Sequence, residues 1–206
     1  RLADHVVRTT GMHVGTGMIG GQWLLRTLSD HGRADVAWGL ATQTTYPSWG
    51  YMVNSGATTV WELWNGDHGD PLMNSGNHVM LVGDLVIWLY ECLAGIQADP
   101  ALPAFKHIVM KPLLVGDLQF VKATHHSPYG LIASEWHRTK QQFTWQITVP
   151  PNTTATVWVP AGSDAPVRES GQPVNDARGV KFLRREPGHA VLEVLSGSYR
   201  FESETD

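Results

Sequence analysis

The sequence predicts an α+β chain in which a helical first part is followed by a separate antiparallel β-sandwich. Up to about residue 96 the apolar residues recur at helical spacing, whereas beyond Pro100 and Pro103 they recur at every second position. Turns rich in proline and glycine separate the runs of this second kind. We therefore expect two domains, one over residues 1–97 and the other over 98–206.

Composition excludes several classes of protein. The chain has 206 residues, 42% of them apolar, with nine tryptophans, a net charge of -4 and no basic run. Nucleic-acid binding needs clustered Lys and Arg, so no nucleic-acid partner is expected. The longest apolar run, Val79–Leu93, is interrupted by charged residues and too short to span a bilayer. We expect no membrane partner and a soluble protein, either cytoplasmic or secreted. Cys92 has no second cysteine to pair with, and its apolar surroundings predict a small core residue.

The first elements are helices. Residues 1–15 give a weak helix signal, and Thr16 is placed to cap the next helix, which ends at His31-Gly32. The stripe of this helix that we expect to be buried consists of Ile19, Trp23, Leu24 and Leu28. A further helix is expected over residues 33–42, with Val36, Ala37, Leu40 and Ala41 buried.

Three further elements follow before the domain boundary. Pro47 stops helix continuation, so residues 46–51 are expected to form a loop. A short helix is predicted over Thr58–Trp64, and a long one from about Ser75 to Leu93 with Gly95 after its end. The long helix is apolar almost all round, which indicates burial within a larger helical assembly. Asp84 and Glu91 on this helix are interpreted as a polar seam that pairs with neighbouring helices.

The second part shows the two-residue period of strands. Residues 142–149 place Phe143, Trp145, Ile147 and Val149 on one face. Residues 155–159 repeat the pattern, and residues 191–201 are expected to supply a last pair of strands around Ser196-Gly197-Ser198. Short strands with turns between them are typical of a sandwich.

The stretch from Tyr46 to His78 combines aromatic rings, one central carboxylate and small polar groups. Carbohydrate sites have this chemistry, because rings cover the apolar faces of a sugar while polar side chains bond its hydroxyls. The candidate site residues are Glu62, His78, Trp49 and Trp61.

Each candidate also has a structural interpretation. Glu62 lies three residues after Thr59, which fits a helix capping box, whereas its tryptophan neighbours partly remove it from water and suit acid/base work. His78 opens a buried helix, where it is either a structural histidine or a ligand for a sugar hydroxyl. Any one of Trp49, Trp61 and Trp64 could be a core residue.

Metal binding is not supported by the spacing of possible ligands. Asp67, Asp70 and Asn74 form an incomplete version of an oxygen-rich calcium loop, and a solvated loop is the better explanation for them. The histidines show no ligand spacing with cysteine or with a second acidic group.

Several segments taken together resemble one enzyme family over nearly the whole chain. The segments are residues 41–52, 56–64, 77–80, 90–96, 110–112, 127–130 and 150–154. They resemble the bacterial α-L-rhamnosidases of glycoside hydrolase family 78. The resemblance implies the C-terminal part of an (α/α)6 toroid followed by a β-sandwich, and inverting hydrolysis that releases L-rhamnose from its glycosides without a cofactor.

The resemblance also implies roles for individual residues. It places the general base on Glu62 and rhamnose binding on His78. Trp49 and Trp61 are expected to be further sugar contacts because they are aromatic residues of the same stretch. In inverting glycosidases the two carboxyl groups stand roughly 6.5–9.5 Å apart, which leaves room for a water between base and sugar. The family's general acid lies upstream of the matched segments, so we expect the chain to be a C-terminal portion that needs the upstream half of the enzyme as its partner, with a rhamnose-containing glycoside as substrate.

A rival interpretation is a carbohydrate-binding module, or a structural fragment, without catalysis. Conversion of Glu62 to glutamine separates these interpretations, because sugar binding would survive the change and hydrolysis would not.

Overall fold

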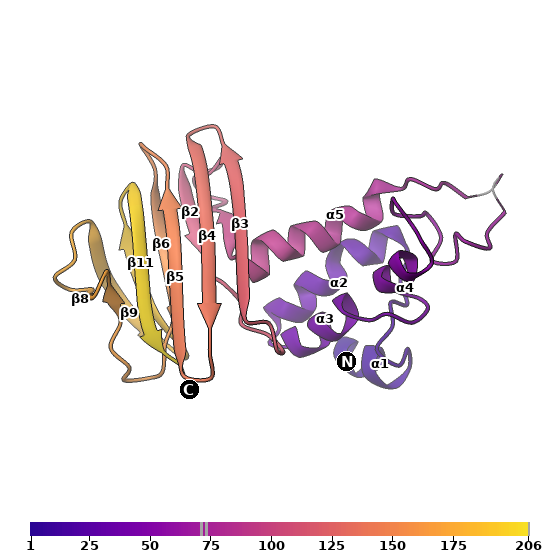
Figure 1. Ribbon diagram of the computed structural model, residues 1–206, viewed down its shortest axis with the longest axis horizontal. Coiled ribbons are helices and arrows are strands. Elements are labelled where there is room, and N and C mark those ends of the chain that lie inside the picture. The colour runs from indigo at the N-terminus through magenta and orange to yellow at the C-terminus, as the bar shows by residue number, and fades with distance from the viewer. Residues whose placement is uncertain (71, 73, 206) are drawn as a thin grey trace. The chain divides into compact units, whose positions relative to one another are not determined.

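The structure is a computed structural model that describes residues 1–70, 72 and 74–205 (Figure 1). The chain divides into two compact units, Arg1–Leu89 and Tyr90 onwards. The domain boundary between residues 97 and 98 stays a prediction, since a division by packing does not test it.

The first unit is helical. Its helices are α1 (Leu2–Arg8), α2 (Met18–Asp30), α3 (Ala34–Ala41), α4 (Trp49–Asn54) and α5 (Val79–Trp88), followed by a π-helical turn over Leu89–Leu93. Helix α2 packs against both α3 and α5, and its Leu24, Leu25 and Leu28 are buried. The Trp88 indole N–H of α5 donates to Ser29 Oγ of α2 at 2.8 Å. Within the described residues, no helix is long and apolar enough to cross a membrane.

The start of α2 differs from the prediction. The N-cap is Gly17 rather than Thr16, and the buried Thr16 hydroxyl makes no hydrogen bond within the described part of the chain. Ile19 and Trp23 were expected to be buried but are 81% and 60% exposed. The stripe that α2 buries against α3 and α5 is therefore narrower than predicted. The described residues leave its apolar side chains Ile19 and Trp23 uncovered.

Two predicted local structures are wrong. The loop over residues 46–51 contains the start of α4, because the buried Ser48 side chain accepts a hydrogen bond from Tyr51 N–H at 2.9 Å and caps the helix. Thr58–Trp64 forms bends and a turn instead of a helix. Helix α5 begins at Val79, later than the predicted Ser75, and Gly95 follows its π-helical turn with φ +70°.

Asp84 of α5 is buried and faces α2. A Cβ added at Gly21 would lie 3.7 Å from Asp84 Oδ2, and this oxygen has no hydrogen-bond partner among the described residues. Burial raises the pKa of Asp84, and the positive charge of Arg26 opposes this shift. Asp84, one of the two residues of the predicted polar seam, thus has surroundings that favour the neutral form of its carboxyl group.

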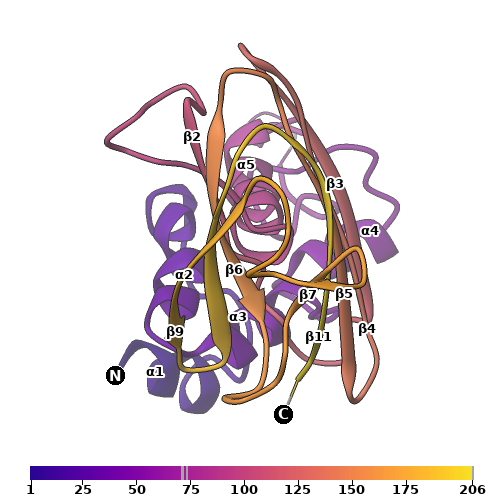
Figure 2. The same ribbon diagram turned by 90° about the vertical axis from the view of Figure 1, so that its left-hand side faces the viewer.

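The second unit is a sandwich of two sheets (Figure 2). In the described part of the chain, the sheet orders are β1-β2-β6-β10-β9 and β3-β4-β5-β11-β7-β8. The strands of the first sheet are β1 (Ile96–Ala98), β2 (His107–Met110), β6 (Thr154–Pro160), β10 (His189–Val194) and β9 (Val180–Glu186). Those of the second are β3 (Phe120–Ser127), β4 (Gly130–Arg138), β5 (Gln142–Val149), β11 (Gly197–Glu204), β7 (Arg168–Glu169) and β8 (Gln172–Pro173). Every pairing is antiparallel except that β2 runs parallel to β6.

The sandwich core follows the predicted alternation. Phe143, Trp145, Ile147 and Val149 of β5 are all buried between the sheets. The indole N–H of Trp145 donates to Ser134 Oγ at 2.9 Å, and Ser134 Oγ donates to the Ala94 carbonyl at 2.7 Å. The two rings of Trp136 and Trp145 are therefore buried without leaving their N–H groups unpaired, since Trp136 donates to the Leu93 carbonyl at 2.8 Å. Cys92 is buried, as predicted.

The last two strands exist as predicted but do not pair with each other. β10 lies in the first sheet and β11 in the second. At the corner between them, the Tyr199 hydroxyl donates to the Leu195 carbonyl at 2.9 Å. This bond supports an abrupt change of sheet where the sequence pattern suggested a hairpin.

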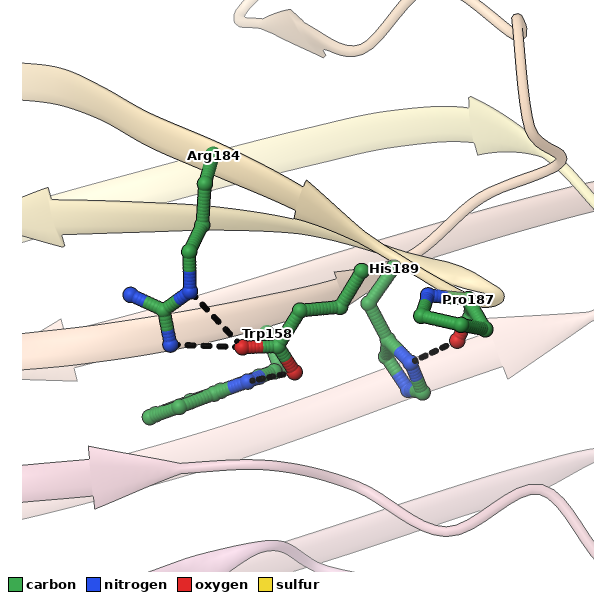
Figure 3. A network of polar contacts seen from close by, with 5 residues as sticks. Trp158, Arg184, Pro187 and His189 are labelled. Carbon is green, nitrogen blue, oxygen red and sulfur yellow. Dashed lines mark hydrogen bonds and ion pairs between the residues drawn. The ribbon is translucent and has the colours of Figure 1, made fainter.

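One polar network lies where β6, β9 and β10 run side by side (Figure 3). The Glu186 carboxylate accepts from the Trp158 indole N–H at 3.0 Å and from Arg184 Nε at 2.8 Å. The Arg184 guanidinium, and then the Trp158 N–H, hold the pKa of Glu186 below its usual range. Burial lowers the pKa of the neighbouring His189.

Candidate functional site

Two backbone segments of the predicted site lie side by side. Glu62 N–H donates to the Ser75 carbonyl at 2.9 Å, and His78 N–H donates to the Val60 carbonyl at 2.6 Å. The Thr59 hydroxyl also donates to the Gly76 carbonyl. These bonds bring the backbones of the predicted base and the predicted sugar ligand together, although many residues of chain separate them. They also explain why Thr58–Trp64 is not a helix, because its backbone groups bond across to the other segment, so the capping-box interpretation of Glu62 is wrong.

The Glu62 carboxylate is fixed by the same pair of segments. Its Oε2 accepts a hydrogen bond from Ser75 N–H at 2.9 Å, and the side chain is half-buried. Glu62 and Ser75 are thus joined by two bonds in opposite directions. A carboxylate held through one oxygen has a defined orientation and keeps its second oxygen for another partner.

His78 stands at the N-cap position of α5 and is half-buried. The imidazole ring carries two nitrogens that can form hydrogen bonds, which suits contact with a hydroxyl group.

The tryptophans of the stretch differ in burial. Trp49 is 8% exposed and makes an edge-to-face contact with Trp64, with ring centroids 5.3 Å apart. The Trp64 indole N–H donates to the Thr16 carbonyl at 3.4 Å. Trp61 is half-buried and lies over Gly66, where an added Cβ would come within 2.7 Å of the ring. Trp49 is therefore part of the packing of the unit, whereas Trp61 and Trp64 are both half-buried.

A pocket of about 420 Å³ borders these segments. Its lining is mainly apolar, with three polar residues, Thr58, Thr59 and Asn77. Trp49 forms one wall, whereas Glu62 and His78 do not line it. Of the four candidate residues, Trp49 therefore borders the pocket, whereas Glu62, Trp61 and His78 lie on the neighbouring loop segments outside its lining.

The acidic loop between the two segments does not gather its oxygens into a cation site. Asp67 accepts from the Tyr51 hydroxyl at 2.8 Å, a bond that raises the pKa of Tyr51. Asp70 accepts from Leu72 N–H at 2.9 Å, and Asn74 Oδ1 accepts from Leu63 N–H at 3.3 Å. Where the structure describes the chain, no group of three or more histidine, cysteine or acidic side chains could hold a metal. These bonds instead order the loop that carries Glu62.

Sequence reasoning gave no role to Ser75, which holds the Glu62 carboxylate. Spacing could not reveal this contact, because the bond joins residues thirteen positions apart through an irregular loop. The polar character of residues 74–78 was the available signal.

A helical unit followed by a β-sandwich, with a carboxylate and a histidine on adjoining loop segments, is typical of a multidomain glycosidase. Residues 1–93 match the family model described as bacterial alpha-L-rhamnosidase 6 hairpin glycosidase domain. Residues 95–173 match that of the bacterial alpha-L-rhamnosidase C-terminal domain. The chain belongs to the bacterial α-L-rhamnosidase family and corresponds to the C-terminal portion of its members.

Known members of the family agree with this assignment. An alpha-L-rhamnosidase of Streptomyces avermitilis is 39% identical over 201 residues, which cover 95% of this chain and 18% of that protein. The solved structure of a Streptomyces avermitilis alpha-L-rhamnosidase complexed with L-rhamnose matches 96% of this chain and 19% of its own, with 37% identity and a TM-score of 0.85. The solved structure of alpha-L-rhamnosidase from Dictyoglumus thermophilum matches 98% of this chain and 22% of its own, with 32% identity and a TM-score of 0.86.

The chain therefore spans about a fifth of the length of these relatives. The predicted fold class, the C-terminal part of an (α/α)6 toroid followed by a β-sandwich, is confirmed.

Proposed function

We propose that this chain is the base-bearing part of an inverting α-L-rhamnosidase, in which Glu62 deprotonates the attacking water. The observation that carries the proposal is the hydrogen-bonded pairing of the Glu62 and Ser75–His78 segments. It orients the Glu62 carboxylate and holds the backbone of His78 on the adjoining segment. The name of the relative solved with L-rhamnose supports the choice of sugar.

Each residue has a distinct role in this proposal. Glu62, with one oxygen held by Ser75, accepts the proton of the water as general base. His78 binds a rhamnose hydroxyl through a ring nitrogen. Trp61 covers an apolar face of the sugar, and Trp49 supports the loop as a wall of the neighbouring pocket.

The general acid comes from upstream helices that complete the toroid. The exposed apolar face of α2, formed by Ile19 and Trp23, supports this part of the proposal, since large apolar side chains together on a surface indicate a contact site. In this arrangement residues 1–97 are the last helices of the toroid, and residues 98–206 are the sandwich domain. The enzyme works either in the cytoplasm or outside the cell.

The test is the hydrolysis of p-nitrophenyl α-L-rhamnoside by the enzyme in which this chain is joined to its upstream helices. Glu62→Gln should lower kcat by roughly 10²–10⁴-fold, the usual contribution of a general base, with a smaller change in KM. The first sugar product, observed by NMR before mutarotation, should be β-L-rhamnose. His78→Ala should act mainly on KM.

Asp70→Asn is the matched control, because it removes a carboxylate from the same loop that bonds only its own turn in the described structure. It should leave kcat within a few-fold of the parent enzyme. A Glu62→Gln variant with full activity would refute the role of Glu62. An initial α-L-rhamnose product would refute inversion, and retained rhamnose binding without any turnover in the parent enzyme would favour a binding module.

A further inference from the structure

The six-stranded sheet of the sandwich carries two neighbouring hollows on its outer face. The first has a volume of about 330 Å³ and is lined by Thr144 and Glu202, among others. The second has a volume of about 360 Å³ and is lined by Glu135 and Gln146, among others. Arg200 of β11 lines both, so the two hollows adjoin each other, and we call the pair of hollows across β4, β5 and β11 the sheet groove. Each volume lies in the range of pockets that hold small molecules.

The strand register explains why polar groups line the sheet groove. Glu135 of β4 is paired with Gln146 of β5, which is paired with Arg200 of β11. These residues share one face because residues directly paired on neighbouring strands point the same way, and the alternate positions of β5 and β11 supply the buried core. A row of hydrogen-bonding side chains therefore crosses three strands.

The β7–β8 hairpin forms a wall of the sheet groove and holds the backbone of Arg200, the residue that lines both hollows. Ser170 N–H donates to the Arg200 carbonyl at 2.8 Å, and Arg200 N–H donates to the Glu169 carboxylate at 3.3 Å. The Arg200 guanidinium pairs with Glu202 at 2.9 Å. A planar cation held in this way is pre-organised, so less side-chain entropy is lost when it bonds a ligand.

The charges of the sheet groove are balanced. Lys122 bonds Glu135 at 2.8 Å from the neighbouring strand, and this bond, more than that of His137, keeps the pKa of Glu135 below its usual range. With this lysine included, the three cations are Lys122, Arg168 and Arg200, and the three anions are Glu135, Glu202 and Glu204. A charge-neutral surface that alternates donors and acceptors does not select an ion.

An aromatic platform adjoins the same face. Phe120 of β3 is 59% exposed and stacks on His137 of β4, with ring centroids 5.8 Å apart and planes 19° apart. His137 also contacts Glu135, a lining residue of the second hollow, at 3.4 Å. An exposed ring beside planar polar groups offers an apolar surface for one face of a ligand.

We propose that the sheet groove binds a neutral saccharide, as a second carbohydrate site on the sandwich, separate from the Glu62 loop. Sugar hydroxyls both donate and accept, which matches carboxylate, amide and guanidinium groups placed in alternation. A polyanion would face three carboxylates, and a protein partner would find little of the apolar core that protein interfaces need. This site does not depend on hydrolysis by Glu62.

The test uses the ¹⁵N-labelled 206-residue chain titrated with L-rhamnose, with rutinose as a rhamnose-terminated disaccharide, and with D-galacturonate as an acidic comparison. We expect the neutral sugars to shift the amide signals of β4, β5 and β11. Arg200→Ala should weaken the binding that these signals report by at least tenfold. Lys181→Ala, which removes an exposed cation from β9 of the other sheet, is the matched control and should bind as the parent chain does.

The proposal is overturned if neither neutral sugar shifts these signals, if only D-galacturonate does, or if Arg200→Ala and Lys181→Ala behave alike. Its failure is distinguishable from failure of the proposed function. Hydrolysis that depends on Glu62 without sugar shifts in the sandwich would refute the sheet groove alone, and groove binding by an enzyme without turnover would refute the catalytic proposal alone.

Discussion

Replacement of Ser134 by alanine tests whether one buried hydroxyl holds the sandwich core together. Ser134 is fully buried, accepts from the Trp145 indole N–H and donates to the Ala94 carbonyl. Ser134→Ala leaves the indole N–H without a partner, which costs about 1–3 kcal/mol, and removes the bond to Ala94, worth about 0.5–1.5 kcal/mol. We expect the free energy of unfolding of the second unit to fall by the sum of the two, about 1.5–4.5 kcal/mol.

Hydrogen exchange of the β4 and β5 amides in the native chain measures this loss, because it reports on the sandwich separately from the helices. Ser198→Ala, the same chemical change at an exposed position of β11, should alter the free energy by less than about 0.5 kcal/mol. Adding Trp145→Phe removes the unpaired donor, so the double variant should lose less than the sum of the single losses. A Ser134→Ala loss no larger than that of Ser198→Ala would refute the reasoning.

Other parts of the chain give further predictions. Because burial raises the pKa of Asp84, its contribution to stability is present at low pH, below the ordinary value of 3.8, and is lost as pH rises through the raised pKa. Asp84→Asn should therefore raise the Tm of the helical unit near pH 7 but not near pH 3, as measured by circular dichroism, and an equal change at both would contradict this. Gly95→Ala should cost about 2–5 kcal/mol in urea unfolding, since φ is +70° and the added Cβ would overlap the chain at residues 111–112. Gly188→Ala, at φ +75° with no described atom within 4 Å of the added Cβ, should cost only about 1–2 kcal/mol, and equal losses would refute the overlap. The pKa of Glu186 is lowered, so its contribution to stability is present above the ordinary value of 4.5 and is lost as pH falls through the lowered pKa. Arg184→Ala should therefore reduce the fall of Tm between about pH 5 and 3. An unchanged profile of Tm against pH would count against the bond between Arg184 and Glu186.

The strands were the most predictable part of the fold. A two-residue period determines which side of a strand is buried, and this holds for every inward residue of β5. The same period cannot tell which strands pair. β10 and β11 are neighbours in sequence but lie in different sheets, because the corner at Leu195 and Tyr199 depends on a contact made only in the folded state.

The helical unit was less predictable than the strands. Ile19 and Trp23 have the spacing of buried residues but are exposed in the described structure, so periodicity reported an apolar stripe without saying what covers it. The candidate site shows a different limit. Glu62 and His78 could be proposed from residue type and family resemblance. The hydrogen bonds that join their two segments involve Ser75 and an irregular loop, which no periodicity describes.

The carbonyl groups that precede Gly95 bear on how the sandwich could be produced by itself. Those of Leu93 and Ala94 accept hydrogen bonds from Trp136 and Ser134 deep in the sandwich. A truncation that starts at residue 95, where the second family match begins, would remove both acceptors. The buried donors on Trp136 and Ser134 would then have lost these partners. An expression boundary at or before Tyr90 keeps these acceptors with the strands that need them.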